Sequence, residues 1–200
     1  MQSVQQVVIA DAPLRWQDIV AVARHGASLS LSYSAWARIE NAQAIVRRIV
    51  DSGERAYGVN TGLGALCNVA LQGEQLSQLS RNTLLSHACG VGPVLADEQT
   101  RAIICAAIVN YSHGKSGIQR PVVEALLNLL ERGITPQVPS QGSVGYLTHM
   151  AHVGICLLAW ARSAIAGRSS MPPAPWPRKA WRRCNWVPRT ACAWSTARRA

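Results

Sequence analysis

The sequence predicts a mainly α-helical protein with short strands near its N-terminus. Most of the first 160 residues place apolar side chains at helical spacing, and glycine or proline separates the successive segments. Only two short runs, residues 7–9 and residues 29–31, suit strands. We therefore expect packed helices, antiparallel wherever the connecting loops are short.

Two helices are expected in the first 53 residues. The segment Leu14–His25 has apolar residues at helical spacing and ends at Gly26. Ser34 is the expected cap of a longer helix that ends at Gly53. One apolar stripe is predicted along this helix, formed by Trp36, Ile39, Ile45, Val46, Ile49 and Val50.

Four further helices are expected in the rest of the chain. They cover Leu76–Cys89, Asp97–Tyr111, Val122–Leu130 and a last apolar segment that runs to Trp160. Pro121 suits the first turn of the third of these helices, because proline needs no hydrogen-bond partner there.

A glycine-rich loop is expected between the second and third helices. Gly58, Gly62 and Gly64 lie within eight residues that begin with Tyr57, a density that rules out a helix. A tyrosine at the head of such a loop is well placed to act as a general base or acid. The alternative is a buried structural loop, and the residues alone do not separate the two.

His87 has the same ambiguity. It lies in the apolar segment Leu84–Gly92, where it is either a satisfied core residue or a functional one. His149 and His152 are three positions apart and could share a helix face, but no third ligand accompanies them. We therefore expect no metal site.

Charge divides the chain near residue 160. Residues 1–160 carry eleven Arg or Lys and ten Asp or Glu, whereas residues 161–200 carry nine basic residues and no acidic ones. We interpret 1–160 as the folded region. Residues 161–200 form a basic tail rich in Trp, Pro and Arg without helical or strand periodicity, either a disordered segment or the product of a frameshift near codon 160.

The location of the charge disfavours a nucleic-acid partner, although basic residues between tryptophans would suit stacking and phosphate contacts. We expect no signal peptide, because the apolar run at residues 7–10 is short and no basic residue precedes it, and the apolar run 151–160 is too short for a membrane span. The cysteines show no CxxC spacing, and the four before residue 160 suit small buried side chains. We expect a cytoplasmic protein without membrane contact.

Four motifs in one order resemble the histidine and aromatic amino-acid ammonia-lyases. The motifs are Tyr57–Gly64, Leu84–Gly92, Ser116–Pro121 and Pro136–Gly145. The resemblance covers about residues 1–160 and implies the helical N-terminal part of the fumarase/aspartase-like fold. Members of the family form homotetramers and release ammonia from histidine, phenylalanine or tyrosine to give the unsaturated acid.

The resemblance assigns roles to three residues. Tyr57 corresponds to the tyrosine thought to act as the base, and Gly64 to a glycine that lies against the bound amino acid. His87 corresponds to a residue that selects and orients the substrate, and a histidine there favours histidine over phenylalanine. The family's electrophile is a methylidene-imidazolone ring formed from an internal Ala-Ser-Gly.

That tripeptide is missing from this sequence. The family continues Gly-Ser-Val-Gly with Ala-Ser-Gly, whereas here Gly145 is followed by Tyr146 and Leu147. The family's C-terminal half is also absent from the chain. We therefore expect no methylidene-imidazolone and no lyase activity. The alternative is a non-catalytic homologue that binds an amino acid or assembles with an active lyase.

Overall fold

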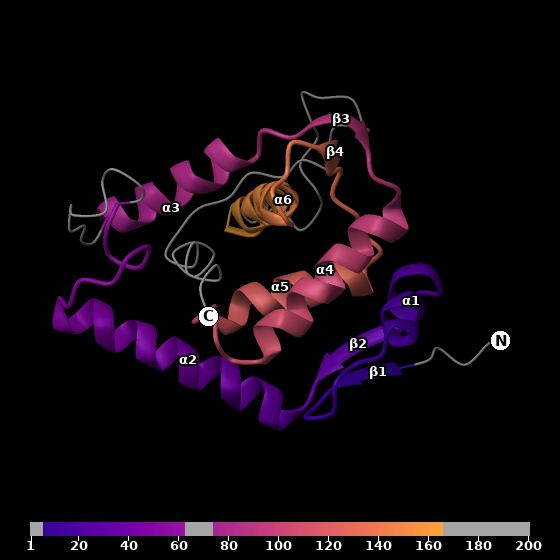
Figure 1. Ribbon diagram of the computed structural model, residues 1–200, viewed down its shortest axis with the longest axis horizontal. Helices are drawn as coiled ribbons and strands as arrows, with labels where there is room; N and C mark the ends of the chain where they lie inside the picture. Colours follow the sequence, from indigo (N-terminus) through magenta and orange to yellow (C-terminus); the bar gives the residue numbers. More distant parts are fainter. Residues whose placement is uncertain (1–5, 63–73, 166–200) are drawn as a thin grey trace.

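The computed structural model describes residues 6–62 and 74–165, and it confirms the mainly α-helical fold class (Figure 1). Its helices are α1 (Trp16–Arg24), α2 (Tyr33–Ser52), α3 (Glu74–His87), α4 (Asp97–Ser112), α5 (Arg120–Glu131) and α6 (Leu147–Ile165). Its strands are β1 (Gln6–Ile9), β2 (Ser28–Leu31), β3 (Val91–Val94) and β4 (Pro139–Gln141).

The two strands expected near the N-terminus are confirmed, and a second pair was not anticipated. β1 and β2 pair in parallel, with Val7 opposite Leu29. β3 and β4 pair antiparallel, with Val91 opposite Gln141 and an irregularity before Val94 meets Pro139. Glycine and proline inside these strands hide the alternation by which strands are identified in a sequence.

The cap of α2 is Ser32, so the prediction of Ser34 was wrong. Ser32 has extended backbone dihedrals (φ −67°, ψ 165°), and its Oγ accepts a hydrogen bond from the Ala35 amide at 3.2 Å. Ser34 lies within the first turn, and its Oγ donates to Asp11 Oδ1 at 3.1 Å. The predicted end of the helix is confirmed, because Gly53 adopts the left-handed conformation with φ 71°.

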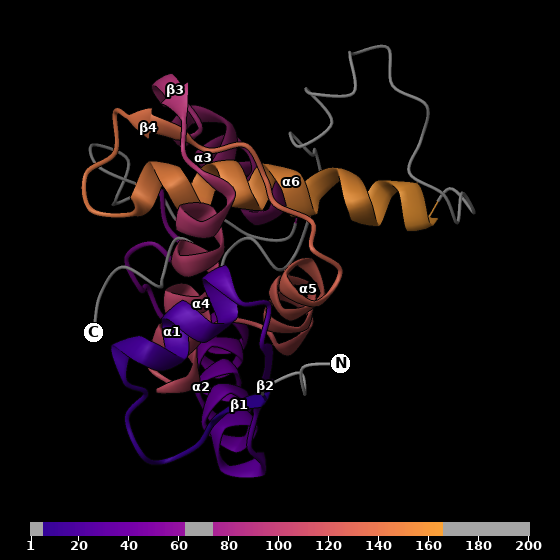
Figure 2. The same ribbon diagram turned by 90° about the vertical axis from the view of Figure 1, so that its right-hand side faces the viewer.

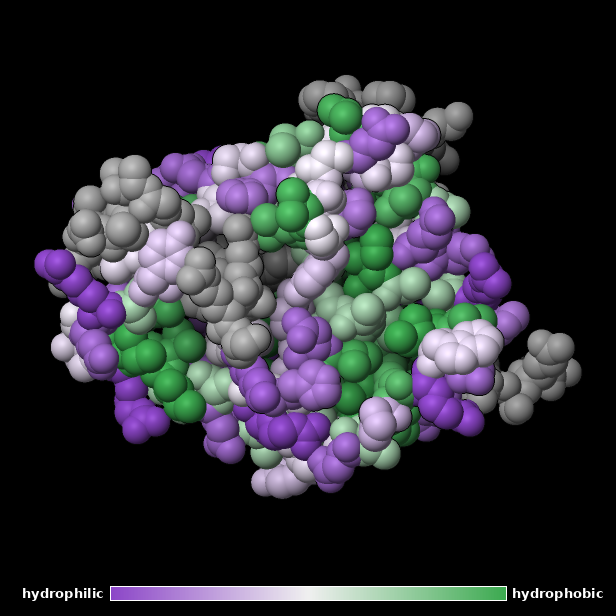
Figure 3. Space-filling model, viewed as in Figure 1, coloured by the Kyte–Doolittle hydropathy of each residue, from purple (hydrophilic) through white to green (hydrophobic). Residues whose placement is uncertain are grey.

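The predicted apolar stripe of α2 is buried only in its first half. The buried residues of the helix are Ala35, Ile39 and Ala42. Ile45 is 50% exposed and Val50 is 37% exposed. Figure 3 shows an apolar patch over this end of α2. The sequence pattern identified the apolar face of α2. It did not indicate how much of that face α4 and α5 cover.

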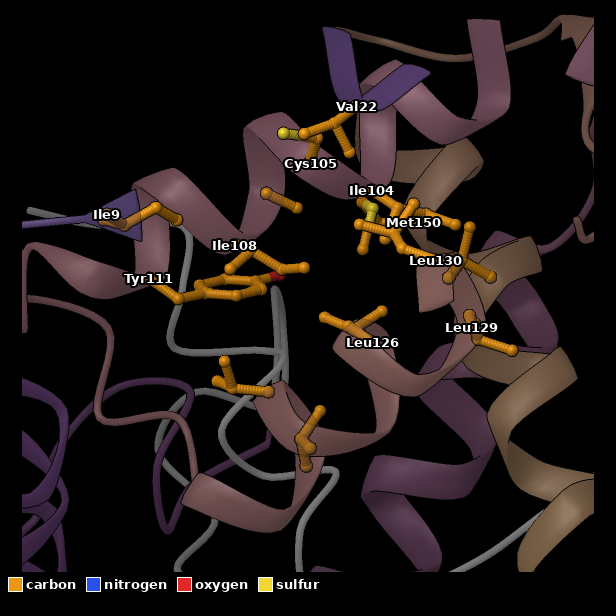
Figure 4. Close-up of a cluster of buried hydrophobic side chains, with 14 of the residues drawn as sticks. Ile9, Val22, Ile104, Cys105, Ile108, Tyr111, Leu126, Leu129, Leu130 and Met150 are labelled. Carbon is orange, nitrogen blue, oxygen red and sulfur yellow. The ribbon is translucent and has the colours of Figure 1, made fainter. Parts of the chain in front are cut away.

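The core lies between β1, α1, α4, α5 and α6 (Figure 4). Tyr111 of α4 points into it beside Ile108 and Leu126, and only 1% of Tyr111 is exposed. Burial raises the pKa of the Tyr111 phenol. It also raises the pKa of the Cys105 thiol to about 11. Cys105 and Cys156 are buried as expected, whereas Cys89 is exposed.

The last helix is longer than predicted. α6 continues past Trp160 to Ile165, and Figure 2 shows it crossing above α4 and α5. Residues 150–154 are all buried, so α6 is covered on more than one face. Its principal partner is α3. Leu84 of α3 packs against Ala151 and Leu158 of α6. Residues 166–200 of the expected tail lie outside the described residues.

Candidate functional site

Tyr57 heads a turn that follows the C-terminal end of α2. Residues 57–60 form the turn, and Tyr57 is 50% exposed. Gly58 has φ +74°, a conformation that favours glycine. The next three residues turn inward, since Val59, Asn60 and Thr61 are 7%, 6% and 2% exposed. Tyr57 therefore lies at the surface, and the buried residues 59–61 fix the loop to the rest of the protein.

Two buried polar side chains hold this loop. The side-chain oxygen Oδ1 of Asn60 accepts a hydrogen bond from the backbone amide of Ala56 at 2.9 Å. The side-chain nitrogen Nδ2 of Asn60 donates one to the Glu54 carbonyl at 2.7 Å. Thr61 Oγ1 accepts from the Gly58 amide at 3.3 Å and donates to the Gly62 carbonyl at 3.0 Å. Gly64, the third residue of the predicted site, lies outside the described residues.

His87 is the last residue of α3. Its Nδ1 lies 2.7 Å from the Thr83 carbonyl oxygen and 3.1 Å from Ser86 Oγ. Because a carbonyl oxygen only accepts hydrogen bonds, Nδ1 carries the hydrogen in this arrangement. In a neutral ring Nε2 then keeps its lone pair and can accept a hydrogen bond from a ligand.

The segment after His87 lies against the segment that leads into α6. β3 and β4 pair, and the Gly90 amide donates to His152 Nε2 at 3.2 Å. A Cβ on Gly90 would lie 3.1 Å from both His152 Nε2 and Pro139 Cβ, so a larger residue would be crowded there. The structure thus joins two of the sequence motifs, 84–92 and 136–145, into one unit.

His152 is the residue whose role sequence reasoning missed. The sequence suggested only that it might share a face of its helix with His149, and no pattern indicated that it would bind a backbone amide 62 positions earlier. That contact depends on how α3 and α6 pack, which residue spacing does not specify.

Residues 142–148, which lead into α6, are joined by hydrogen bonds among themselves. Ser143 Oγ accepts from the Thr148 amide at 3.0 Å and donates to the Gly145 carbonyl at 3.1 Å. Thr148 Oγ1 donates to the Gly142 carbonyl at 3.2 Å. The Thr148 amide in the first turn of α6 thus has a side-chain partner in Ser143, while the neighbouring Val144 is 86% exposed.

Tyr57 and His87 lie at the ends of different helices. Figure 1 shows the C-terminal end of α2 at the left of the molecule and the end of α3 close to β3. The hydrogen bonds of the His87 ring both go to residues of its own helix, Thr83 and Ser86. His87 thus ends α3, the segment that follows it lies against Gly142 and His152, and Tyr57 lies on the loop after α2.

A hollow of about 500 Å³ lies elsewhere on the molecule. It is lined by residues 9–14, by Arg38 and by residues around the end of α4, and it includes neither Tyr57 nor His87. The Arg38 guanidinium there is occupied by Asp11, the Ala10 carbonyl and the Ser112 carbonyl.

In the part of the chain that the structure describes, no group of three or more His, Cys, Asp or Glu side chains is arranged to hold a metal ion. Among the same residues, no helix is both long enough and apolar enough to cross a membrane.

Comparison with known proteins identifies the family. Residues 14–175 match the family model described as aromatic amino acid lyase. The chain belongs to this family. A histidine ammonia-lyase from Treponema denticola is 37% identical over 168 residues, which cover 82% of this chain and 33% of that protein.

Solved structures of lyase-family proteins share the fold. Histidine ammonia-lyase from Trypanosoma cruzi superposes with a TM-score of 0.74 at 25% identity, over 94% of this chain and 39% of that one. Tyrosine aminomutase from Streptomyces globisporus gives a TM-score of 0.74 at 25% identity, over 88% of this chain and 36% of that one. This chain thus spans about a third of the length of the curated relatives that it matches.

Proposed function

We propose that this member of the aromatic amino acid lyase family binds an α-amino acid of the histidine type without eliminating ammonia from it. The observation that carries the proposal is the junction between Gly142 and Thr148. The family resemblance places Ala-Ser-Gly directly after Gly145, where this chain continues with Tyr146 and begins α6 at Leu147. Ser143, just before this point, is engaged in hydrogen bonds on both sides.

The residues of this chain do not suit the family's methylidene-imidazolone. Formation of that ring requires a backbone nitrogen to approach the carbonyl two residues earlier, and glycine supplies the space for it. Ser143 is followed by the β-branched Val144, and the sequence contains no Ala-Ser-Gly. Without an electrophile the β-proton of an amino acid stays too weakly acidic for a tyrosine base, so we derive no elimination step.

The ligand class rests on Tyr57 and His87. His87 Nε2 can accept a hydrogen bond from an imidazole N–H or an ammonium group, because Nδ1 is engaged by Thr83. The half-exposed Tyr57 phenol can donate to a carboxylate or accept from an ammonium group. Relatives named histidine ammonia-lyase, such as the one from Treponema denticola, support an imidazole side chain on the ligand.

Assembly and location complete the proposal. The homotetramers of the family lead us to propose self-association or association with a full-length lyase. The free thiols at Cys105 and Cys156 support a reducing cytoplasmic location.

Calorimetric titration with L-histidine, paired with an assay for released ammonia, tests the proposal. We expect saturable binding without ammonia. Tyr57→Phe and His87→Leu should each weaken binding about tenfold or more, equivalent to the loss of one hydrogen bond of about 1.4 kcal/mol. His113→Leu is the matched control, because His113 is exposed at the end of α4, and it should bind like the parent. Ammonia release would contradict the proposal, as would equal binding by all the variants.

A further inference from the structure

The Tyr57 loop contains a buried amide group with no role in the proposed binding of a ligand. Asn60 is 6% exposed, and both ends of its side chain are hydrogen bonded within the loop. A buried amide of this kind is costly unless its hydrogen bonds are made, so its bonding fixes the backbone around it.

Both neighbours of Tyr57 are held by side chains. Ala56, which precedes it, donates its amide to Asn60 Oδ1 at 2.9 Å, and its carbonyl accepts from the Val59 and Asn60 amides at 3.0 and 3.3 Å. Gly58, which follows it, donates its amide to Thr61 Oγ1 at 3.3 Å. The peptide units on either side of Tyr57 are thus tied to buried groups.

The second bond of Asn60 extends this hold to the end of α2. Its Nδ2 donates to the Glu54 carbonyl at 2.7 Å, one residue after Gly53 ends the helix. Asn60 therefore ties the beginning of the loop to its middle, across the residue that carries the phenol.

We infer that Asn60 is a positioning residue for Tyr57. It sets the place of the Tyr57 backbone, so that the half-exposed phenol is presented at one position before any ligand arrives. An amide suits this task because it donates at one end and accepts at the other, whereas aspartate only accepts and would set an oxygen against the Glu54 carbonyl. The functional part of this inference rests on the proposed binding of an amino acid by Tyr57.

Fluorine NMR of the chain labelled with 3-fluorotyrosine tests the inference without a ligand. The sequence has four tyrosines, at positions 33, 57, 111 and 146, and Tyr57→Phe assigns the resonance of interest. We expect Asn60→Ala to shift the Tyr57 resonance and to narrow it as the loop loosens, with the other three unchanged. Asn60→Asp keeps the acceptor for the Ala56 amide but sets an oxygen against the Glu54 carbonyl, so it should also shift the Tyr57 resonance.

Asn128→Ala is the matched control. Asn128 also donates its amide to a backbone carbonyl, that of Glu124 in α5, at 2.8 Å, and it lies outside the loop. It should leave the Tyr57 resonance in place. If the Tyr57 resonance is unaltered in Asn60→Ala while the other three show a folded chain, the inference is wrong. If Asn60→Ala does not fold, Asn60→Asp decides by the same criterion.

Titration of the same samples with L-histidine separates this inference from the proposed function. We expect Asn60→Ala to bind about tenfold more weakly than the parent. A parent chain that does not bind histidine, combined with a shifted Tyr57 resonance in Asn60→Ala, would refute the proposed function and leave the positioning role intact. If the parent and Asn60→Ala bind histidine equally well although the Tyr57 resonance of the variant is shifted, then Asn60 does not contribute to binding by positioning Tyr57.

Discussion

Arg101 connects three helices through its guanidinium group. Its nitrogens donate to the carbonyls of Val22 at 2.8 Å, Ala23 at 3.2 Å and Leu130 at 3.0 Å. These carbonyls belong to the last turns of α1 and α5, whose C-terminal carbonyls have no partner within their own helices. A positive charge near helix C-termini is also favourable for the helix dipoles. Arg101 therefore closes two helix ends from its place on α4.

We predict that Arg101→Leu lowers the free energy of unfolding by about 2 kcal/mol, because three partly buried carbonyls lose a charged donor. Urea denaturation followed by circular dichroism measures the change. Arg24→Leu is the control, since Arg24 pairs with Glu98 at 2.9 Å where both side chains are exposed, and its loss should cost less than about 1 kcal/mol. Equal effects of the two substitutions would contradict this role of Arg101.

The buried thiol of Cys105 makes stability depend on alkaline pH. Burial raises its pKa from 9.0 to about 11, against the opposing effect of the Arg101 charge. Between these values the thiol ionises in the unfolded chain but not in the folded one. The unfolded state then binds fewer protons, so stability falls as pH rises.

We predict that the free energy of unfolding declines between pH 9 and 11 by at most about 1.4 kcal/mol per pH unit for this thiol. Urea midpoints across this range measure the decline. Cys105→Ala should reduce the slope of the unfolding free energy against pH. The part of the slope due to Tyr111 should remain, because burial also raises the pKa of Tyr111. A Cys105→Ala slope equal to that of the parent would show that the thiol does not contribute.

At the scale of elements, α2 combines a packed half and an exposed half. Ile39 is 1% exposed and Ile45 is 50% exposed, although both belong to the same apolar stripe. We predict that Ile39→Ala costs about 2–5 kcal/mol, because it leaves a cavity in the core. Ile45→Ala should cost less than about 1 kcal/mol in the isolated chain. Thermal or urea unfolding distinguishes the pair, and similar losses would mean that the second half of α2 is also packed.

The helices could be predicted from the sequence because their apolar residues recur at helical spacing and glycine or proline lies near most of their boundaries. Gly53 ends α2, and Pro121 lies in the first turn of α5, both as expected. The Ser32 cap could not be distinguished from Ser34, since both are serines and only the extended backbone of Ser32 decides between them.

The site was less predictable than the fold. The sequence singled out Tyr57 and His87, but the unit around His87 depends on the pairing of β3 with β4 and on the bond from Gly90 to His152. The segments of this unit lie some fifty positions apart. Their contact follows from the packing of α3 on α6, for which a single sequence carries no local signal.

At the scale of the whole molecule, this chain has a lyase-family fold in which residues 142–148, before and at the start of α6, are hydrogen bonded to one another. Ser143 Oγ accepts a hydrogen bond from the Thr148 amide in the first turn of α6, and Thr148 Oγ1 donates one to the Gly142 carbonyl. The loop that carries Tyr57 is nevertheless held by Asn60 and Thr61, and the segment that follows His87 is held by β3 and His152. This combination supports ligand binding without elimination as the account of this chain.

Proton NMR of L-histidine mixed with the protein tests that account most directly, because one spectrum reports both binding and elimination. We predict saturation transfer from the protein to the histidine protons, and no vinyl resonances of an unsaturated acid after prolonged incubation. Vinyl resonances that grow with time and require the protein would contradict the account, and so would a complete lack of saturation transfer.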